Sequence, residues 1–135
     1  MRDTLPASAI HILFVEDHAQ LRDLQLEILS SQGFQVTAAA SGDQAAALLE
    51  QGLQPDVLLS DIRMPGRLDG VALARWVRER YPEMVILLQT AFADADIGGF
   101  RVMLKPFDPD TILALLRQMI ADRRRDLDRP ESPDT

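Results

Sequence analysis

The sequence contains no cysteine, so disulfide bonds and metal sites built on thiolates are excluded. It also lacks any apolar run close to the roughly 20 residues that a membrane-spanning helix requires. Asp3 places an acid in the first few residues, and no small-residue cleavage site follows a long apolar stretch, so a secretory signal is not expected. These absences predict a cytoplasmic protein with no membrane partner.

Positive charge is in the minority, because 14 lysines and arginines stand against 21 aspartates and glutamates, a formal net charge of −7. This balance argues against direct DNA binding by the domain itself. The one basic run, Arg123–Arg125, is flanked by Asp122 and Asp126, and we interpret it as a solvated helix face.

The chain has 135 residues, of which 47% are hydrophobic and 26% charged, values typical of a single globular domain with a substantial core. We expect an N-terminal lead over residues 1–8 and one folded domain over residues 9–127. Residues 128–135 are polar and rich in proline, and we expect them to form a disordered tail.

Short apolar runs alternate with amphipathic stretches. The runs predict five strands, at 10–15, 34–39, 56–60, 85–90 and 101–104. The amphipathic stretches predict helices at 19–33, 42–52, 70–81 and 108–127. The pattern predicts an α/β fold, a five-stranded parallel sheet with helices on both faces.

Two helices carry specific expectations. In the first helix, the apolar spacing places four residues toward the core: Leu21, Leu24, Ile28 and Leu29. The last helix is expected to begin at Asp108 as its N-cap and to direct four residues inward: Ile112, Leu115, Leu116 and Met119.

The strand ends carry the chemistry, because open α/β sheets bind ligands outside the carboxyl ends of their strands. The first strand ends at Glu16 and Asp17, and the third ends at Asp61. Three carboxylates at one edge would repel one another unless a cation neutralises them. Mg²⁺ fits such a set of oxygen ligands best.

A hydroxyl and an ammonium group end the other two strands. Thr90 ends the fourth strand, and Lys105 follows the fifth. A cation and hydrogen-bond donors of this kind can stabilise a transferring phosphoryl group while one carboxylate acts as the nucleophile.

Four motifs in this order resemble those of the receiver domain of two-component response regulators. They are "ED" (16–17), "SDIRMPG" (60–66), "QTA" (89–91) and "KPF" (105–107), each at a strand end. The resemblance covers about residues 9–122 and implies the chemotaxis-type, flavodoxin-like doubly wound fold.

The resemblance also implies a metal site and a phosphoacceptor. Asp61 corresponds to the phosphoacceptor, and Glu16, Asp17 and Asp61 correspond to the Mg²⁺ ligands. The backbone of Arg63 would complete the site. Its carbonyl would bind the metal, and its backbone would also contact the phosphoryl group.

Further positions correspond to the groups that hold the phosphoryl group. Thr90 corresponds to the hydroxyl that contacts it, Ala91 to the small residue whose backbone amide helps to bind it, and Lys105 to the family's lysine. The peptide bond before Pro106 is expected to be cis, as is usual in the family.

The chain departs from the family pattern in two places. Residues 91–104 are too few for a full fourth helix before the last strand, and this shortening resembles receivers that work with hybrid sensor kinases. Val102 stands where the family often has an aromatic side chain that moves with the threonine. Valine has no ring, and Phe92 or Phe100 could substitute.

The resemblance implies a phosphoacceptor in a two-component or phosphorelay system. Asp61 would accept the phosphoryl group from a phosphohistidine of a sensor histidine kinase or a histidine phosphotransfer domain, in a Mg²⁺-dependent reaction. The domain would catalyse only its own phosphorylation and slow dephosphorylation, so it would not be an enzyme. We expect a monomer or weak dimer that signals by protein contact, with the donor docking on the first helix and near Pro106–Pro109.

Two alternatives stay open. A pseudo-receiver would bind partners without being phosphorylated. A phosphatase-like enzyme with an aspartate nucleophile would need a second acid two residues later, where this chain has Arg63. A nucleotide- or flavin-binding domain is disfavoured because no glycine-rich loop follows the first strand.

Overall fold

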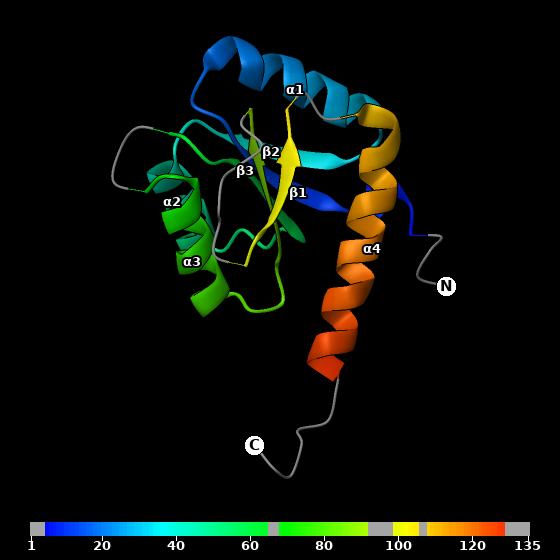
Figure 1. Cartoon of the computed structure of the whole chain (residues 1–135). Coiled ribbons are helices and arrows are strands. Elements are labelled where there is room, and N and C mark those ends of the chain that lie inside the picture. The colour runs from blue at the N-terminus through cyan, green and yellow to red at the C-terminus, as the bar shows by residue number, and fades with distance from the viewer. Residues whose placement is uncertain (1–4, 65–67, 92–98, 106–107, 129–135) are drawn as a thin grey trace.

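The computed structural model describes residues 5–64, 68–91, 99–105 and 108–128. These segments form one sheet with helices packed on both of its faces (Figure 1). Several earlier expectations fall outside the described residues: residues 1–4 of the lead, Phe92 as an aromatic substitute, any curtailed helix over residues 92–98, the cis bond at Pro106 and residues 129–135 of the tail. The tail was expected from residue 128, but Asp128 still belongs to the last helix.

The five strands form one parallel sheet in the spatial order β2-β1-β3-β4-β5. Their bounds are β1 His11–Val15, β2 Gln35–Ala39, β3 Val57–Asp61, β4 Val85–Thr90 and β5 Arg101–Leu104. Each lies within one residue of its predicted range. The order reverses between β1 and β3, so the carboxyl ends of these two strands flank the switch point of a flavodoxin-like sheet.

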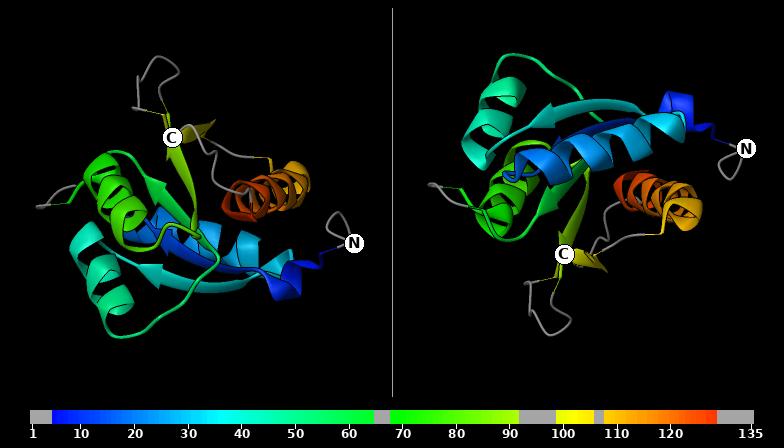
Figure 2. Two further views of the ribbon diagram at one scale, coloured as in Figure 1. Left: turned by 90° about the horizontal axis from the view of Figure 1, so that it is seen from below. Right: turned by 90° about the horizontal axis from the view of Figure 1, so that it is seen from above.

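The helices cover the two faces in pairs (Figure 2). Their bounds are α1 Ala19–Ser31, α2 Gly42–Glu50, α3 Gly70–Arg80 and α4 Pro109–Asp128, and a short 3₁₀ turn, Ala7–Ala9, precedes β1. Helices α1 and α4 pack on one face, where Phe14 is fully buried, and α2 and α3 on the other, beside Leu13. Alternate residues of β1 therefore belong to different halves of the core.

The sequence predicted side-chain N-caps for α2 and α4, and both are present in the structure. Ser41 Oγ accepts a hydrogen bond from the Gln44 N–H at 3.0 Å. Asp108 Oδ1 accepts one from the Asp110 N–H at 2.9 Å, and α4 follows directly. No helix in the described part of the chain is long and apolar enough to span a membrane.

The inner face of α1 differs from the prediction. Leu21 and Leu24, expected in the core, are 42% and 54% exposed, whereas Gln25 is only 8% exposed. Leu29 is buried as predicted, and Ile28 packs partly buried against the same cluster. The prediction was wrong because it ranked residues by hydropathy alone, and Gln25 has a buried hydrogen-bonding partner on the sheet.

The inner face of α4 agrees better with the prediction. Ile112 and Leu116 are fully buried, while Leu115 and Met119 pack partly buried at the edge of the same cluster. Ile120 completes the buried stripe.

Candidate functional site

The candidate site lies at the carboxyl ends of β1, β3 and β5. Glu16 directly follows β1, and its backbone N–H continues the ladder by donating to the Ala39 carbonyl at 3.1 Å. Asp61 is the last residue of β3, and Lys105 follows β5. These rigid strand ends hold their side chains in fixed positions.

Three acidic side chains meet there. Carboxylate oxygens of Glu16, Asp17 and Asp61 all lie within 4.8 Å of one another. Glu16 is 1% exposed, the Asp61 side chain is 14% exposed, and Asp17 faces solvent. The cluster therefore runs from the protein interior to the surface.

Lys105 connects two members of this cluster. Its Nζ lies 2.9 Å from Glu16 Oε1 and 3.0 Å from Asp61 Oδ2. One ammonium group thus contacts two carboxylates in a cluster of three, and excess negative charge remains beside it.

The pKa values show this imbalance. Burial raises the pKa of Asp61, and the charges of Glu16 and Asp17 add to the rise, more than Lys105 lowers it. Burial would also raise the pKa of Glu16, but hydrogen bonds with Lys105, the His18 N–H and Asp17, together with the charge of Lys105, outweigh it and lower that pKa. Burial opposes the charge of Lys105 as well, yet its two carboxylate partners raise its pKa.

The donor set suits a hard divalent cation. All three ligand groups are carboxylates, the oxygen donors that Mg²⁺ and Ca²⁺ prefer, and the single lysine leaves their charge incompletely neutralised. The site therefore fits the Mg²⁺ that the sequence predicted.

Thr90 ends β4, the strand next to Asp61. It is 5% exposed, and its carbonyl accepts a hydrogen bond from the Lys105 N–H at 2.8 Å. Ala91 follows it at the surface. The structure thus brings Thr90 and Lys105 to one edge through a direct backbone link.

Arg63 and Val102 lie at the margins of the site. Arg63 is exposed and lines a surface hollow together with Ile62, Met64 and Asp69. Val102, on β5, packs partly buried against the α2–α3 half of the core, as does Phe100.

Gly70, the first residue of α3, fixes the chain after Asp61. A Cβ atom there would lie 2.1 Å from the Asp61 carbonyl oxygen and 2.7 Å from the Ile62 Cα. The Gly70 N–H donates to the Ile62 carbonyl at 2.9 Å. Only a residue without a side chain permits this approach.

Sequence reasoning assigned no role to three polar residues beside the site: Arg22, Gln25 and Gln89, the last of which begins the motif "QTA". Gln25 and Gln89 form a buried pair between α1 and β4, and Arg22 contacts the backbone of the acidic pair. One signal was available, because Gln89 interrupts the otherwise apolar strand "VILLQT".

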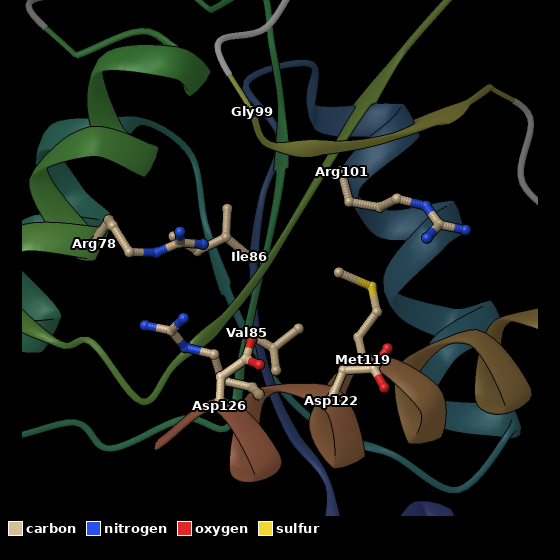
Figure 3. A pocket seen from close by; sticks show the side chains of 9 residues that line it. Arg78, Val85, Ile86, Gly99, Arg101, Met119, Asp122 and Asp126 are labelled. Carbon is tan, nitrogen blue, oxygen red and sulfur yellow. The ribbon is translucent and has the colours of Figure 1, made fainter. Parts of the chain in front are cut away.

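A second hollow lies elsewhere (Figure 3). It has a volume of about 350 Å³ and is lined by side chains from α3, β4, β5 and α4, among them Arg78, Ile86, Arg101 and Met119. It shares no residue with the acidic cluster and includes Val85, at the opposite end of β4. It is therefore separate from the candidate site.

Comparisons with known proteins all point to one family. The sequence profile described as "Response regulator receiver domain" matches residues 12–117. The DNA-binding transcriptional regulator NtrC of Salmonella typhimurium is 36% identical over 114 residues, which are 79% of this chain and 24% of that protein. The chain thus spans only a minor part of this relative.

Solved structures show the same similarity. A response regulator receiver protein from Sinorhizobium medicae WSM419 is 29% identical with a TM-score of 0.74, and the match covers 84% of this chain and 96% of that one. The chemotaxis protein CheY4 of Vibrio cholerae is 28% identical with a TM-score of 0.71, over 82% of this chain and 98% of that one.

Proposed function

Because the chain belongs to the response regulator receiver domain family, we propose that it accepts a phosphoryl group on Asp61. One observation carries the proposal. The Asp61 carboxylate lies at the tip of a buried strand, 3.0 Å from Lys105 Nζ and beside two further acids. A nucleophile needs such a fixed position, and phosphoryl transfer needs positive charge close to it.

Glu16, Asp17 and Asp61, with the backbone carbonyl of Arg63, would hold Mg²⁺. Bound there, the ion supplies positive charge that neutralises the phosphoryl oxygens and allows them to approach the carboxylates. Lys105, whose Nζ lies 3.0 Å from Asp61 Oδ2, would add a second positive charge.

An oxygen of Asp61 attacks the phosphorus atom of the donor phosphohistidine. The phosphorus–nitrogen bond breaks as the phosphorus–oxygen bond of the aspartyl phosphate forms. The Thr90 hydroxyl and the Ala91 amide, together with the backbone at Arg63, would hydrogen-bond the transferred group. Its slow hydrolysis would return Asp61, so the domain acts as a relay and not as an enzyme that turns over a substrate.

Receiver domains interact with histidine kinases or phosphotransfer proteins, and α1 offers a surface for such a donor. Leu21 and Leu24 lie exposed on this helix, which begins at Ala19, after the acidic pair and the N-cap His18. We infer that the donor's helices dock there and present the phosphohistidine to Asp61. Signalling would then proceed by protein contact in the cytoplasm, from a monomer or weak dimer.

The relatives named NtrC bind DNA, but the match covers only part of them. The net charge of −7 argues against direct DNA binding by this domain. The pseudo-receiver and phosphatase alternatives are not favoured, because the acids and Lys105 converge on Asp61 and Arg63 replaces the second acid.

Intact mass spectrometry tests the proposal directly. The protein is incubated with Mg²⁺ and acetyl phosphate beside the variants Asp61→Asn and Asp69→Asn. Asp69 caps α3 through its side chain, and asparagine preserves such a cap, so this variant is a matched control near the site. One phosphoryl adduct is expected in the parent and the control, and none in Asp61→Asn or without Mg²⁺.

Two outcomes contradict the proposal. An adduct that persists in Asp61→Asn would identify another acceptor. No adduct in the parent, combined with no chemical-shift change at Glu16, Asp17 and Asp61 during a Mg²⁺ titration, would make the domain a pseudo-receiver.

A further inference from the structure

Helix α1 carries two polar side chains on one face, and they reach the ends of two different strands. Arg22 and Gln25 are three positions apart, so they lie on the same side of the helix. Arg22 contacts the chain after β1, and Gln25 contacts β4.

Arg22 ties α1 to the acidic pair. Its Nη1 donates to the Glu16 carbonyl at 3.1 Å and lies 3.5 Å from the Asp17 carbonyl. The His18 N–H also donates to Glu16 Oε2 at 3.1 Å, just before the helix begins. The position of the two acids thus depends on where α1 lies.

Gln25 ties the same helix to β4. Gln89 Nε2 donates to Gln25 Oε1 at 3.1 Å, and Gln25 Nε2 donates to Gln89 Oε1 at 3.4 Å. Gln89 is fully buried and Gln25 is 8% exposed. Each side-chain amide therefore finds its partner in the other, away from water.

Gln89 in turn holds the site from the side of β4. It lies opposite Asp61 in the β3–β4 register, and its carbonyl accepts a hydrogen bond from the Ile62 N–H at 3.0 Å. Thr90 is the next residue. A continuous chain of contacts thus links the acidic pair, α1, Gln89 and the residues around Asp61.

A purely structural role does not require polar groups here. The surrounding half of the core is apolar, with Phe14, Leu29 and Leu87 buried in it. Two leucines would fill such a space without the cost of removing amides from water. Hydrogen bonds, however, are restricted in both distance and angle. Two of them therefore define the separation and the orientation of α1 and β4 more closely than apolar contacts do.

We propose that Gln25 and Gln89, with Arg22, are positioning residues that set the separation between the Glu16–Asp17 pair and Thr90. Arg22 contacts the carbonyls of Glu16 and Asp17, and the two glutamines contact each other, so all three would act through the backbone of the site residues. This inference rests on the proposed phosphorylation of Asp61.

The test compares the double variant Gln25→Leu/Gln89→Leu with the parent. Neither leucine leaves a buried amide unpaired, so the variant is expected to fold and to unfold at a urea concentration close to that of the parent. Leu29→Val is the matched control, because it alters the same α1–sheet contact without touching the polar pair. Arg22→Met tests the other end of the link.

Three quantities are measured: the urea midpoint, the Mg²⁺ concentration for half-saturation by NMR, and the rate of phosphorylation by acetyl phosphate. The double variant should phosphorylate about tenfold more slowly, because small misplacements of reacting groups have large effects on rate. Arg22→Met should raise the Mg²⁺ half-saturation severalfold, and Leu29→Val should leave both values within about twofold of the parent.

A double variant with the parent's rate and Mg²⁺ affinity would overturn the inference and leave the proposed function intact. An equal slowing in Leu29→Val would also overturn it, since loose packing alone would then explain the effect. A parent that forms no adduct would reject the proposed function itself, and the inference with it.

Discussion

Lys105 and Asp61 lie 3.0 Å apart, Nζ to Oδ2, although they end strands that are not neighbours in the sheet. Strand β4 runs between β3 and β5, so the long lysine side chain reaches across the end of β4 to the carboxylate. The same Nζ contacts Glu16, which follows β1, at 2.9 Å. This single side chain therefore joins three strand ends and compensates part of their negative charge.

Replacing Lys105 by methionine should separate these two roles. Without the ammonium group the carboxylates repel one another, so the free energy of unfolding should fall by about 1–3 kcal/mol without metal. Added Mg²⁺ should restore part of the loss. The phosphorylation rate should fall about a hundredfold, as when one charge-stabilising donor is removed from an active site.

Urea denaturation with and without Mg²⁺ and the acetyl phosphate assay measure these effects. Arg101→Met is the control, because it removes a positive charge from the exposed surface of β5 instead. A Lys105→Met variant phosphorylated at the parent's rate would contradict the assigned role.

Asp61→Asn should stabilise the metal-free protein at neutral pH. Burial and the charges of Glu16 and Asp17 raise the pKa of Asp61, so the folded protein binds this proton at a higher pH than the unfolded chain does. Stability therefore decreases as the pH rises from the ordinary aspartate pKa through the raised one. Asparagine does not ionise, so the Asp61→Asn variant does not lose stability in this way.

To test this expectation, the urea midpoints of the parent and of Asp61→Asn are measured in EDTA from about pH 3 to about pH 8. The gain of Asp61→Asn should be complete at the upper end and should vanish at the lower end. Asp69→Asn, at the exposed cap of α3, is the control. A variant less stable than the parent at pH 8 would refute the interpretation.

Gly70→Ala should destabilise the protein, although the same exchange inside a helix normally stabilises by about 0.5–1 kcal/mol. The added Cβ would lie 2.1 Å from the Asp61 carbonyl oxygen, so the chain after β3 would have to move. We expect a loss of about 1–3 kcal/mol in the free energy of unfolding. Slower phosphorylation should accompany it, because Asp61 moves too.

Thermal or urea unfolding measures the sign of this change. Ala47→Gly on the exposed side of α2 gives the ordinary helix effect of glycine for comparison. If Gly70→Ala is as stable as the parent or more stable, the chain after β3 can move away from the added Cβ without loss of free energy, and the prediction is wrong.

Polar substitution of Leu21 and Leu24 should weaken transfer from a protein donor only. Both side chains are exposed, so Leu21→Gln/Leu24→Gln should leave stability nearly unchanged. Phosphorylation by acetyl phosphate should proceed at the parent's rate. Transfer from a phosphorylated histidine phosphotransfer domain should need at least tenfold more donor for half-maximal rate, because apolar docking contacts are lost.

Rapid-quench transfer assays with the two kinds of donor distinguish these rates. Leu127→Gln, an exposed leucine near the end of α4, is the control for nonspecific effects of surface polarity. Equal transfer to the parent and to the double variant would place the docking surface elsewhere.

Much of the fold follows from local sequence. Each strand is a short apolar run, and the glycines and caps that bound the helices act within a few residues, as at Ser41 and Asp108. Because parallel strands direct their carboxyl ends to one edge, the sequence also predicted which acids, hydroxyl and lysine would meet there. In the structure the three acids and Lys105 do lie together at that edge.

Only the tertiary structure decided which face of α1 is buried. Leu29 can lie at the edge of a stripe that includes Leu21 and Leu24 or of one that includes Gln25, and hydropathy favours the first. The structure selects the second, because Gln89 on β4 supplies a buried partner for the Gln25 amide. The partner lies 64 positions away in the chain, and no local pattern contains it.

The balance of charge at the site also depends on the tertiary structure. The sequence by itself determined that Glu16, Asp17, Asp61 and Lys105 share one edge of the sheet. It did not determine that one ammonium group contacts two of the three acids, or that the pKa of Asp61 rises while that of Glu16 falls. Those outcomes depend on distances and burial between strand ends, which arise only when the sheet has assembled.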